Sequence, residues 1–185
     1  YFSFNYGHYA QSPSLYFLYA GLGTNDRINF PLKGNSDLHH ERSEGFEFSY
    51  SHAFATSSHV RATGFYREYS DMVDSDVMDL SLGSLRQETI FSNTAFGRTR
   101  GVEVSFSHQF DRSFNLSLGY TYMRATGTAN SPEERYARFI STGTEVGVVE
   151  SELQWDQRHT YLIVPRYSTE NFEFGAIARL FSSRD

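Results

Sequence analysis

The chain has 185 residues, a formal net charge of -6 at neutral pH and no cysteine. The acidic balance argues against nucleic acid as a partner, and the lack of cysteine excludes a disulfide framework and a thiolate metal site. Aromatic residues make up 17% of the chain, with 17 Phe and 13 Tyr against a single Trp, which is typical of a protein that places rings at a boundary between apolar and aqueous surroundings.

No apolar run approaches the roughly 18 residues that a membrane-spanning helix needs. The longest clean run lies near residues 161–164. A transmembrane β-barrel would show no such run, because each of its strands alternates apolar with polar side chains. The lack of a spanning helix therefore does not exclude a membrane protein.

The first two predicted strands alternate strictly. Residues 1–9 and residues 44–54 each place aromatic side chains at every second position, as at Phe46 and Phe48, with small or polar side chains between them. A β-strand sends successive side chains to opposite faces, so each strand has one aromatic and one polar face. A long connection with several rings, residues 13–43, lies between the two strands.

A tight polar turn, residues 55–58, leads to the third predicted strand, residues 59–69. Its faces are less regular, with Arg61 and Arg67 on one and a smaller, more apolar set on the other. An arginine that faces lipid near the midplane costs about 2–4 kcal/mol. We therefore expect both arginines to point inward, followed by a second long, acidic connection over residues 71–88.

Four more strands are predicted in the rest of the chain, at residues 89–110, 116–127, 155–167 and 172–181. Short polar turns again alternate with a long connection, which is acidic and rich in Gly and Ser, at residues 128–153. Pro165 lies inside one of these strands and has no N–H for a ladder hydrogen bond. We expect an irregularity at that end of the strand.

These patterns predict an all-β fold, an antiparallel transmembrane β-barrel segment of about seven strands. Strands of about ten residues cross a bilayer when tilted, and lipid offers the backbone no partners, so such strands close into a barrel. Bacterial barrels usually have an even number of strands, so we expect residues 1–185 to be part of one larger barrel domain. A charge at Phe48 should then block assembly, whereas a charge at Ser49 should be tolerated.

The segment GNSDLHHERSEGFEFSY, residues 34–50, resembles a stretch of TonB-dependent outer-membrane receptors that reads roughly GNPxLKPExSxxxExGY. Ser36 and His40 stand where the family has proline, and His39 stands where it has lysine. The residues that match are Gly34, Asn35, Leu38, Glu41, Ser43, Glu47 and Tyr50.

Three further segments are similar to the same family, in the same order along the chain. VRATGFYREYSDMV resembles its strand-and-rim pattern, NTAFGRTRGVEVSFSHQF its Gly-Val-Glu strand, and LQWDQRHTYLIV its WDQRHT strand start. The matching residues of the last two segments are Asn93, Gly101, Val102, Glu103, Trp155, Asp156, Arg158, His159 and Thr160.

The resemblance implies the downstream part of a large barrel whose N-terminal plug domain and remaining strands are not in this chain. Such receptors lie in the outer membrane of Gram-negative bacteria, bind a scarce nutrient and import it with energy passed from the TonB complex to an N-terminal box. The implied partners are outer-membrane lipid, the TonB complex and a small-molecule, glycan or peptide nutrient that the sequence does not name. No enzyme activity and no cofactor are implied.

Candidate binding residues are few. The candidate ligand contacts are Tyr9 and Gln11, which face the lumen, and Tyr16 and Tyr19 in the ring-rich connection, because extracellular loops carry recognition in such scaffolds. Rings at the rim also serve as membrane anchors. The run His39-His40-Glu41 lacks the spacing of a zinc helix, and Asp156, Arg158 and His159 come without a nucleophile elbow. We therefore predict no metal site and no catalytic group, and expect the last three residues to satisfy one another at a strand start.

Two alternatives to a TonB-dependent receptor remain at this point. One is a passive or anchoring outer-membrane barrel without energy coupling, and the other is a soluble β-sandwich binding module. A sandwich would tolerate the strand lengths and the alternation of turns, but it would not favour a second face made of small polar side chains.

Overall fold

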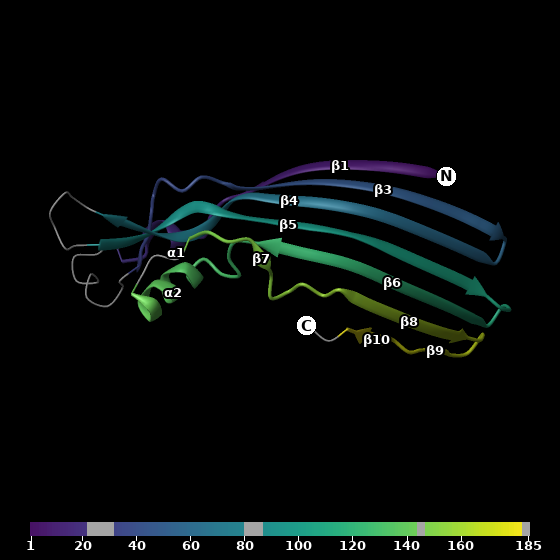
Figure 1. The fold of residues 1–185 in the computed structure, drawn as a ribbon. Coiled ribbons are helices and arrows are strands. Elements are labelled where there is room, and N and C mark those ends of the chain that lie inside the picture. Colours follow the sequence, from purple (N-terminus) through teal and green to yellow (C-terminus); the bar gives the residue numbers. More distant parts are fainter. Residues whose placement is uncertain (22–31, 80–86, 144–146, 183–185) are drawn as a thin grey trace.

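A computed structural model describes residues 1–21, 32–79, 87–143 and 147–182. It forms one mostly antiparallel sheet with two short helices near one end (Figure 1). The elements in chain order are β1 (Phe2–Gln11), α1 (Leu15–Tyr19), β2 (Leu32–Lys33), β3 (Glu41–Ala55), β4 (Ser58–Asp79), β5 (Gln87–Gln109), β6 (Phe114–Gly127), α2 (Glu134–Thr142), β7 (Ser151–Glu152), β8 (His159–Ser168), β9 (Glu173–Gly175) and β10 (Ala178–Phe181).

The principal strands pair in the order β1-β3-β4-β5-β6-β8-β10, so each long strand lies beside the next one in the chain. The predicted set of about seven antiparallel strands is therefore confirmed, with β9 and β10 as two parts of the last one. Within the described residues the sheet is open, and β1 and β10 are its edges. The fold is a stretch of barrel wall rather than a closed barrel.

The two ends of the wall differ as the sequence predicted. Tight turns join β3 to β4, β5 to β6 and β8 to β9 at one end, here called the turn end. At the turn between β5 and β6, the Asp111 carboxylate accepts the backbone N–H groups of Ser113 (2.7 Å) and Phe114 (2.8 Å). The long connections and both helices lie at the other end, here called the loop end (Figure 1).

The structure corrects the extent of the acidic connection predicted at residues 71–88. β4 runs on to Asp79 and β5 already begins at Gln87, so most of this segment is a strand hairpin. The register shifts twice, between Tyr69 and Met72 and between Met72 and Asp74. Such irregularities change which side chains face which side, so the acidic pattern was compatible with pairing. Elements that are distant in the chain pack against this hairpin and stabilise it.

Two other predicted connections contain secondary structure, and one strand begins later than predicted. The connections at residues 13–43 and 128–153 contain the helices α1 and α2 and the short strands β2 and β7. The strand predicted from Trp155 begins at His159 instead, because residues 153–156 form a turn in which the Asp156 N–H donates to the Leu153 carbonyl (2.8 Å).

The two faces of the wall follow the alternation of the sequence. The register places Phe4, Phe48, Gly64, Val102 and Tyr122 in one row across five strands. Rings on this face touch across strands, as where the Phe2 and Phe48 centroids lie 5.9 Å apart. The apolar side chains stay uncovered: Phe48 is 54% exposed. An uncovered apolar face of this size suits contact with lipid.

The opposite face is polar, and Ser49 on it is only 2% exposed. Its hydroxyl bonds the Thr63 hydroxyl (2.9 Å) and accepts a hydrogen bond from Arg61 (3.3 Å). Ser49 is therefore a poor place to test tolerance of charge, because an arginine would displace this packed group. Thr121, half-buried and opposite Glu103 in the register, is a better one.

The irregularity predicted at Pro165 lies in the neighbouring strand and not in β8, which runs through Pro165 from His159 to Ser168. Its partner strand is interrupted there, so that β9 ends at Gly175 and β10 begins at Ala178. Pro165 offers no N–H to this partner, but its carbonyl accepts the N–H of Ala176 (3.1 Å).

The main apolar core lies at the loop end, not along the wall. Leu32, Val73 and Phe91 are buried together, and Phe17 and Leu38 pack against them. Two rings from different segments meet here, with the Phe17 and Phe91 centroids 4.9 Å apart. Among the described residues, no helix is long and apolar enough to cross a membrane.

Candidate functional site

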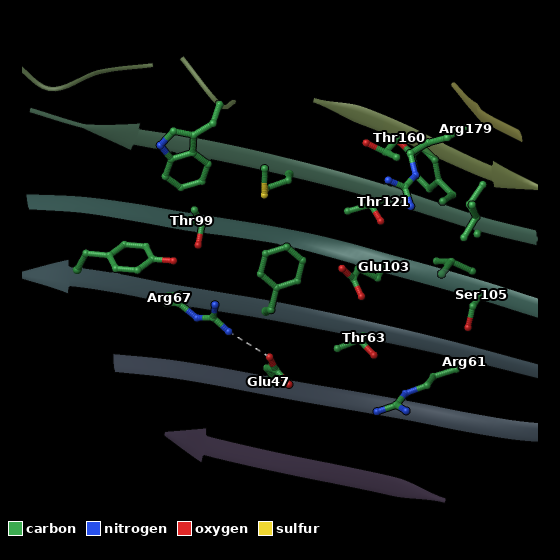
Figure 2. A pocket seen from close by; sticks show the side chains of 18 residues that line it. Glu47, Arg61, Thr63, Arg67, Thr99, Glu103, Ser105, Thr121, Thr160 and Arg179 are labelled. Carbon is green, nitrogen blue, oxygen red and sulfur yellow. Dashed lines mark ion pairs between the residues drawn. The ribbon is translucent and has the colours of Figure 1, made fainter. Parts of the chain in front are cut away.

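The polar face of the wall surrounds a hollow of about 870 Å³. Figure 2 shows its side chains converging from neighbouring strands. The charged, serine and threonine side chains in it are Glu47, Arg61, Thr63, Arg67, Thr99, Glu103, Ser105, Thr121, Thr160 and Arg179. The sequence-predicted inward placement of Arg61 and Arg67 is confirmed. Arg179 and the threonines were not singled out from the sequence, although their parity in the strands carried that information.

The charges in the hollow pair only in part. Arg67 lies 3.6 Å from the Glu47 carboxylate, as the dashed line in Figure 2 marks. Arg61 instead donates to the Ser49 hydroxyl, and among the described residues Glu103 has no ion pair within 4.0 Å. Arg67 and Glu47 thus form an inward pair of opposite charges. The remaining charges face the open hollow.

Gly101 leaves room on the wall for the ring of Phe65. Phe65 and Gly101 are partners in the register. A Cβ at Gly101 would lie 2.6 Å from the Phe65 ring and 2.2 Å from the Tyr122 carbonyl oxygen. The backbone oxygen cannot move away cheaply, so the position requires glycine. This explains the glycine of the Gly-Val-Glu motif by steric exclusion rather than by backbone freedom.

We predict that Gly101→Ala destabilises the folded wall by about 1–3 kcal/mol, the usual range for overpacking. The matched control is Gly147→Ala, because a Cβ at Gly147 meets no atom within 4 Å. Urea unfolding of the full-length protein in detergent measures both. Equal midpoints for the two variants would contradict the steric role of Gly101.

The first family-like motif clamps the segment before β3 onto the loop end. The Asn35 side-chain amide donates to the Phe91 carbonyl (2.9 Å), and its oxygen accepts the Asp37 N–H (2.9 Å). The Gly34 N–H donates to the Ala20 carbonyl (2.6 Å), and a Cβ at Gly34 would lie 2.5 Å from the Ala20 nitrogen. The motif thus seats residues 32–38 between α1 and β5.

Two more motif residues, Asn93 and Glu41, form a second clamp. Asn93 accepts the His39 N–H (2.7 Å) and donates to the Asp71 carbonyl (2.6 Å). Glu41 accepts the Val73 N–H (2.9 Å). Because these bonds join three segments that are distant in sequence, the motif residues fix how the loop end is assembled. Ser43 lies between Tyr9 and Tyr69 in the register.

The WDQRHT segment forms a third clamp at the start of β8. Asp156 is 6% exposed, accepts the Ala125 N–H (2.7 Å) and pairs with Arg158 (2.6 Å). Arg158 also contacts Glu152, and the hydrogen bond with Asp156 raises the pKa of Arg158 so that it stays charged. The sequence prediction that these groups satisfy one another at a strand start holds for Asp156 and Arg158.

His159 and Trp155 take other positions. His159 bonds the Tyr120 hydroxyl (2.9 Å) and lies against the Tyr122 ring, so it belongs to the apolar face. Trp155 lines the hollow and is 45% exposed.

Three acidic groups at the loop end have shifted pKa values. Burial raises the pKa of Asp74 above 3.8, although the Ser75 N–H and the Arg135 charge oppose this. Burial also raises the pKa of Tyr136. Glu134 goes the other way: burial works against its ionisation, but hydrogen bonds from Asn130 and Arg138 outweigh that effect and lower its pKa.

The shift of Asp74 predicts a pH dependence. Its folded state binds the proton more tightly than the unfolded chain, so stability is lost as pH rises from about 3.8 through the raised pKa. We expect Asp74→Asn to increase the hydrogen-exchange protection of residues 73–75 at pH 7. The decrease of this protection as pH rises above about 3.8 should also be smaller in the variant than in the wild type. Glu134→Gln should lower protection at pH 7. A carboxylate whose pKa is lower in the folded state than in the unfolded chain stabilises the fold at pH values above its unfolded pKa. Equal protection of wild type and Asp74→Asn at pH 7 would contradict the first expectation.

The candidate ligand contacts lie away from the hollow. Tyr16 packs edge-on against Phe17 and Phe91, with the Phe91 centroid 5.8 Å away. Tyr9 and Tyr19 are 66% and 58% exposed, and Gln11 pairs with Glu41 in the register. All four are described, and none of them lines the hollow. Their role in ligand binding stays a prediction.

The two adjacent histidines serve the loop end in different ways. His40 bonds the Ser12 hydroxyl (3.2 Å), while the His39 backbone is held by Asn93. Within the described ranges, no three His, Cys, Asp or Glu side chains gather closely enough to hold a metal ion.

The wall therefore has an uncovered aromatic face, a polar face with a hollow, tight turns at one end and clamped connections at the other. This is the geometry of a transmembrane β-barrel wall. The family model described as TonB dependent receptor-like, beta-barrel matches residues 2–177. The chain belongs to the TonB-dependent receptor β-barrel family.

A solved structure gives the same fold. The structure titled "Copper transporter OprC" is similar with a TM-score of 0.59 at 14% sequence identity, over 97% of this chain and 24% of that chain. The chain thus spans about a quarter of the length of that protein. No curated protein matches the sequence.

Proposed function

We propose that the full-length protein is an outer-membrane receptor that imports a scarce nutrient with energy coupled through TonB. The observation that carries the proposal is the family match over residues 2–177. The fold agrees with it, because the aromatic face suits lipid and the polar face suits a water-filled lumen. On this arrangement the turn end faces the periplasm and the loop end faces the exterior.

The chemistry of this function is binding and gated passage, with no covalent step. We further propose that residues 1–185 belong to one barrel domain and that a plug, outside this chain, lies against the hollow. Glu103 and Arg179 line the hollow and would meet such a plug with charges of both signs. The nutrient stays unnamed, because likeness to a copper transporter at 14% identity bears on the fold alone.

Uptake measurements test the proposal. In a host that lacks its own copy, the full-length protein should restore uptake of its nutrient, and deletion of TonB should abolish that uptake. Equal uptake with and without TonB would favour the passive barrel. Failure to enter the outer membrane fraction would contradict the location itself.

A further inference from the structure

The aromatic face has a groove at Gly64. This groove, about 560 Å³, lies among Phe48, Val102 and Tyr122, with Tyr66 next to it. A Cβ at Gly64 would meet no atom within 4 Å. The strands on both sides of Gly64 carry large side chains in the same register row. The missing side chain therefore leaves an apolar groove on the face that we assign to lipid.

Two arginines stand at the loop-end side of this groove. Arg100 and Arg124 both line it, and they are direct partners in the register between β5 and β6. Like charges placed opposite each other destabilise a sheet pair. Arg124 lies 3.5 Å from Glu152, whereas Arg100 has no ion pair within 4.0 Å in the part of the chain that the structure describes.

The neighbouring guanidinium groups are only partly compensated. Within the described residues, the Nε atom of Arg124 is buried and makes no hydrogen bond. Acids do lie nearby: Glu68 is the register partner of Arg98, Glu150 pairs with Arg98 (3.5 Å), and Glu152 also contacts Arg158. These carboxylates neutralise part of the positive charge. The charge of Arg100 stays available for an anion from outside the chain.

We propose that the groove and its two arginines bind one phosphate-bearing lipid of the outer leaflet. Its acyl chain would lie over Gly64, and its phosphate would accept hydrogen bonds from Arg100 and Arg124. Guanidinium groups recognise phosphate well, because their planar donors match two oxygens at once. From the midplane of the membrane toward its surface, the apolar groove comes first and the two arginines follow. The acyl chain and the head group of a lipid follow in the same order. This inference rests on the outer-membrane location proposed above.

Native mass spectrometry of the purified full-length receptor tests the site. The probes are lipopolysaccharide, the same lipid with its phosphates removed, and inorganic phosphate. We expect lipopolysaccharide to stay bound and the dephosphorylated lipid to bind about tenfold more weakly or worse, since each charge-assisted hydrogen bond is worth that much. Equal binding of both lipids would overturn the role of phosphate, and displacement by inorganic phosphate would assign the arginines to a free anion.

Two test variants and one control locate the binding. Gly64→Leu fills the groove, and the double variant Arg100→Gln/Arg124→Gln removes the charges. Each of these two should reduce lipid retention about tenfold or more. Arg166→Gln is the control, because Arg166 is exposed near the turn end and pairs with Glu173 (3.2 Å). Unchanged lipid retention in Gly64→Leu would overturn the proposal. If the double variant does not fold, Arg100→Gln alone replaces it, and unchanged retention in that variant would also overturn the proposal. Absence of the wild-type protein from the outer membrane would instead contradict the proposed function.

Discussion

Replacing Phe48 by arginine is expected to prevent assembly of the full-length barrel in the outer membrane. Phe48 lies in the middle of β3 on the aromatic face, and it is 54% exposed to what we assign as lipid. A charge at that depth costs about 2–4 kcal/mol, and the contact with the Phe2 ring is lost as well. Outer-membrane fractionation with heat-modifiability on gels measures the folded fraction.

The matched substitution is Thr121→Arg on the opposite face of the same sheet. Thr121 lines the hollow and stands opposite Glu103 in the register, so the new guanidinium gains a carboxylate and stays in water. We expect near wild-type assembly. If Phe48→Arg and Thr121→Arg assembled equally well, the assignment of the two faces would be wrong.

Replacing Asp156 by alanine is the second change with a large expected effect. It removes the acceptor for the buried Ala125 N–H and the partner of Arg158 at once. A hydrogen bond to a charged group is worth about 1.5–3 kcal/mol, and a buried donor left without an acceptor costs a similar amount. We expect the start of β8 to open first, with a loss of about 2–4 kcal/mol in urea unfolding of the full-length protein.

Two controls separate the parts of this effect. Asp156→Asn keeps an oxygen for Ala125 but loses the charge, so its loss should be smaller. Glu150→Ala removes an exposed carboxylate that pairs with Arg98 at 3.5 Å, and exposed pairs are worth only about 0–1 kcal/mol. A loss for Glu150→Ala as large as that for Asp156→Ala would show that the third clamp has no special role.

The clamps also suggest why the family-like motifs occur where they do. Asn35, Asn93 and Asp156 each bind backbone groups of another segment with their side chains. Connections that leave a barrel have no sheet partner of their own, and their buried backbone groups need acceptors and donors. The motifs therefore fix the loop end on the wall.

The strands of the wall and its two faces could be predicted from the sequence alone. Strict alternation assigned Phe46 and Phe48 to one face, and the lipid cost of charge placed Arg61 and Arg67 on the other, because strand periodicity is local and does not depend on distant contacts. Turn lengths predicted the alternation of tight and elaborate ends. Pro165 marked the place of an irregularity, because its missing N–H is a property of the residue itself, but the interruption falls in the neighbouring strand.

The assembly of the loop end could not be predicted in this way, because it depends on contacts between distant segments. The hairpin of β4 and β5 extends through residues predicted as a connection, because α1 and β2 cover Phe91 and α2 lies beside β4. The roles of Asn93 and Asp156 as clamps, the ring of Phe65 over Gly101 and the groove at Gly64 all depend on which residues meet across strands. Register pairs residues that are tens of positions apart, and local periodicity carries no information about the groups that meet there.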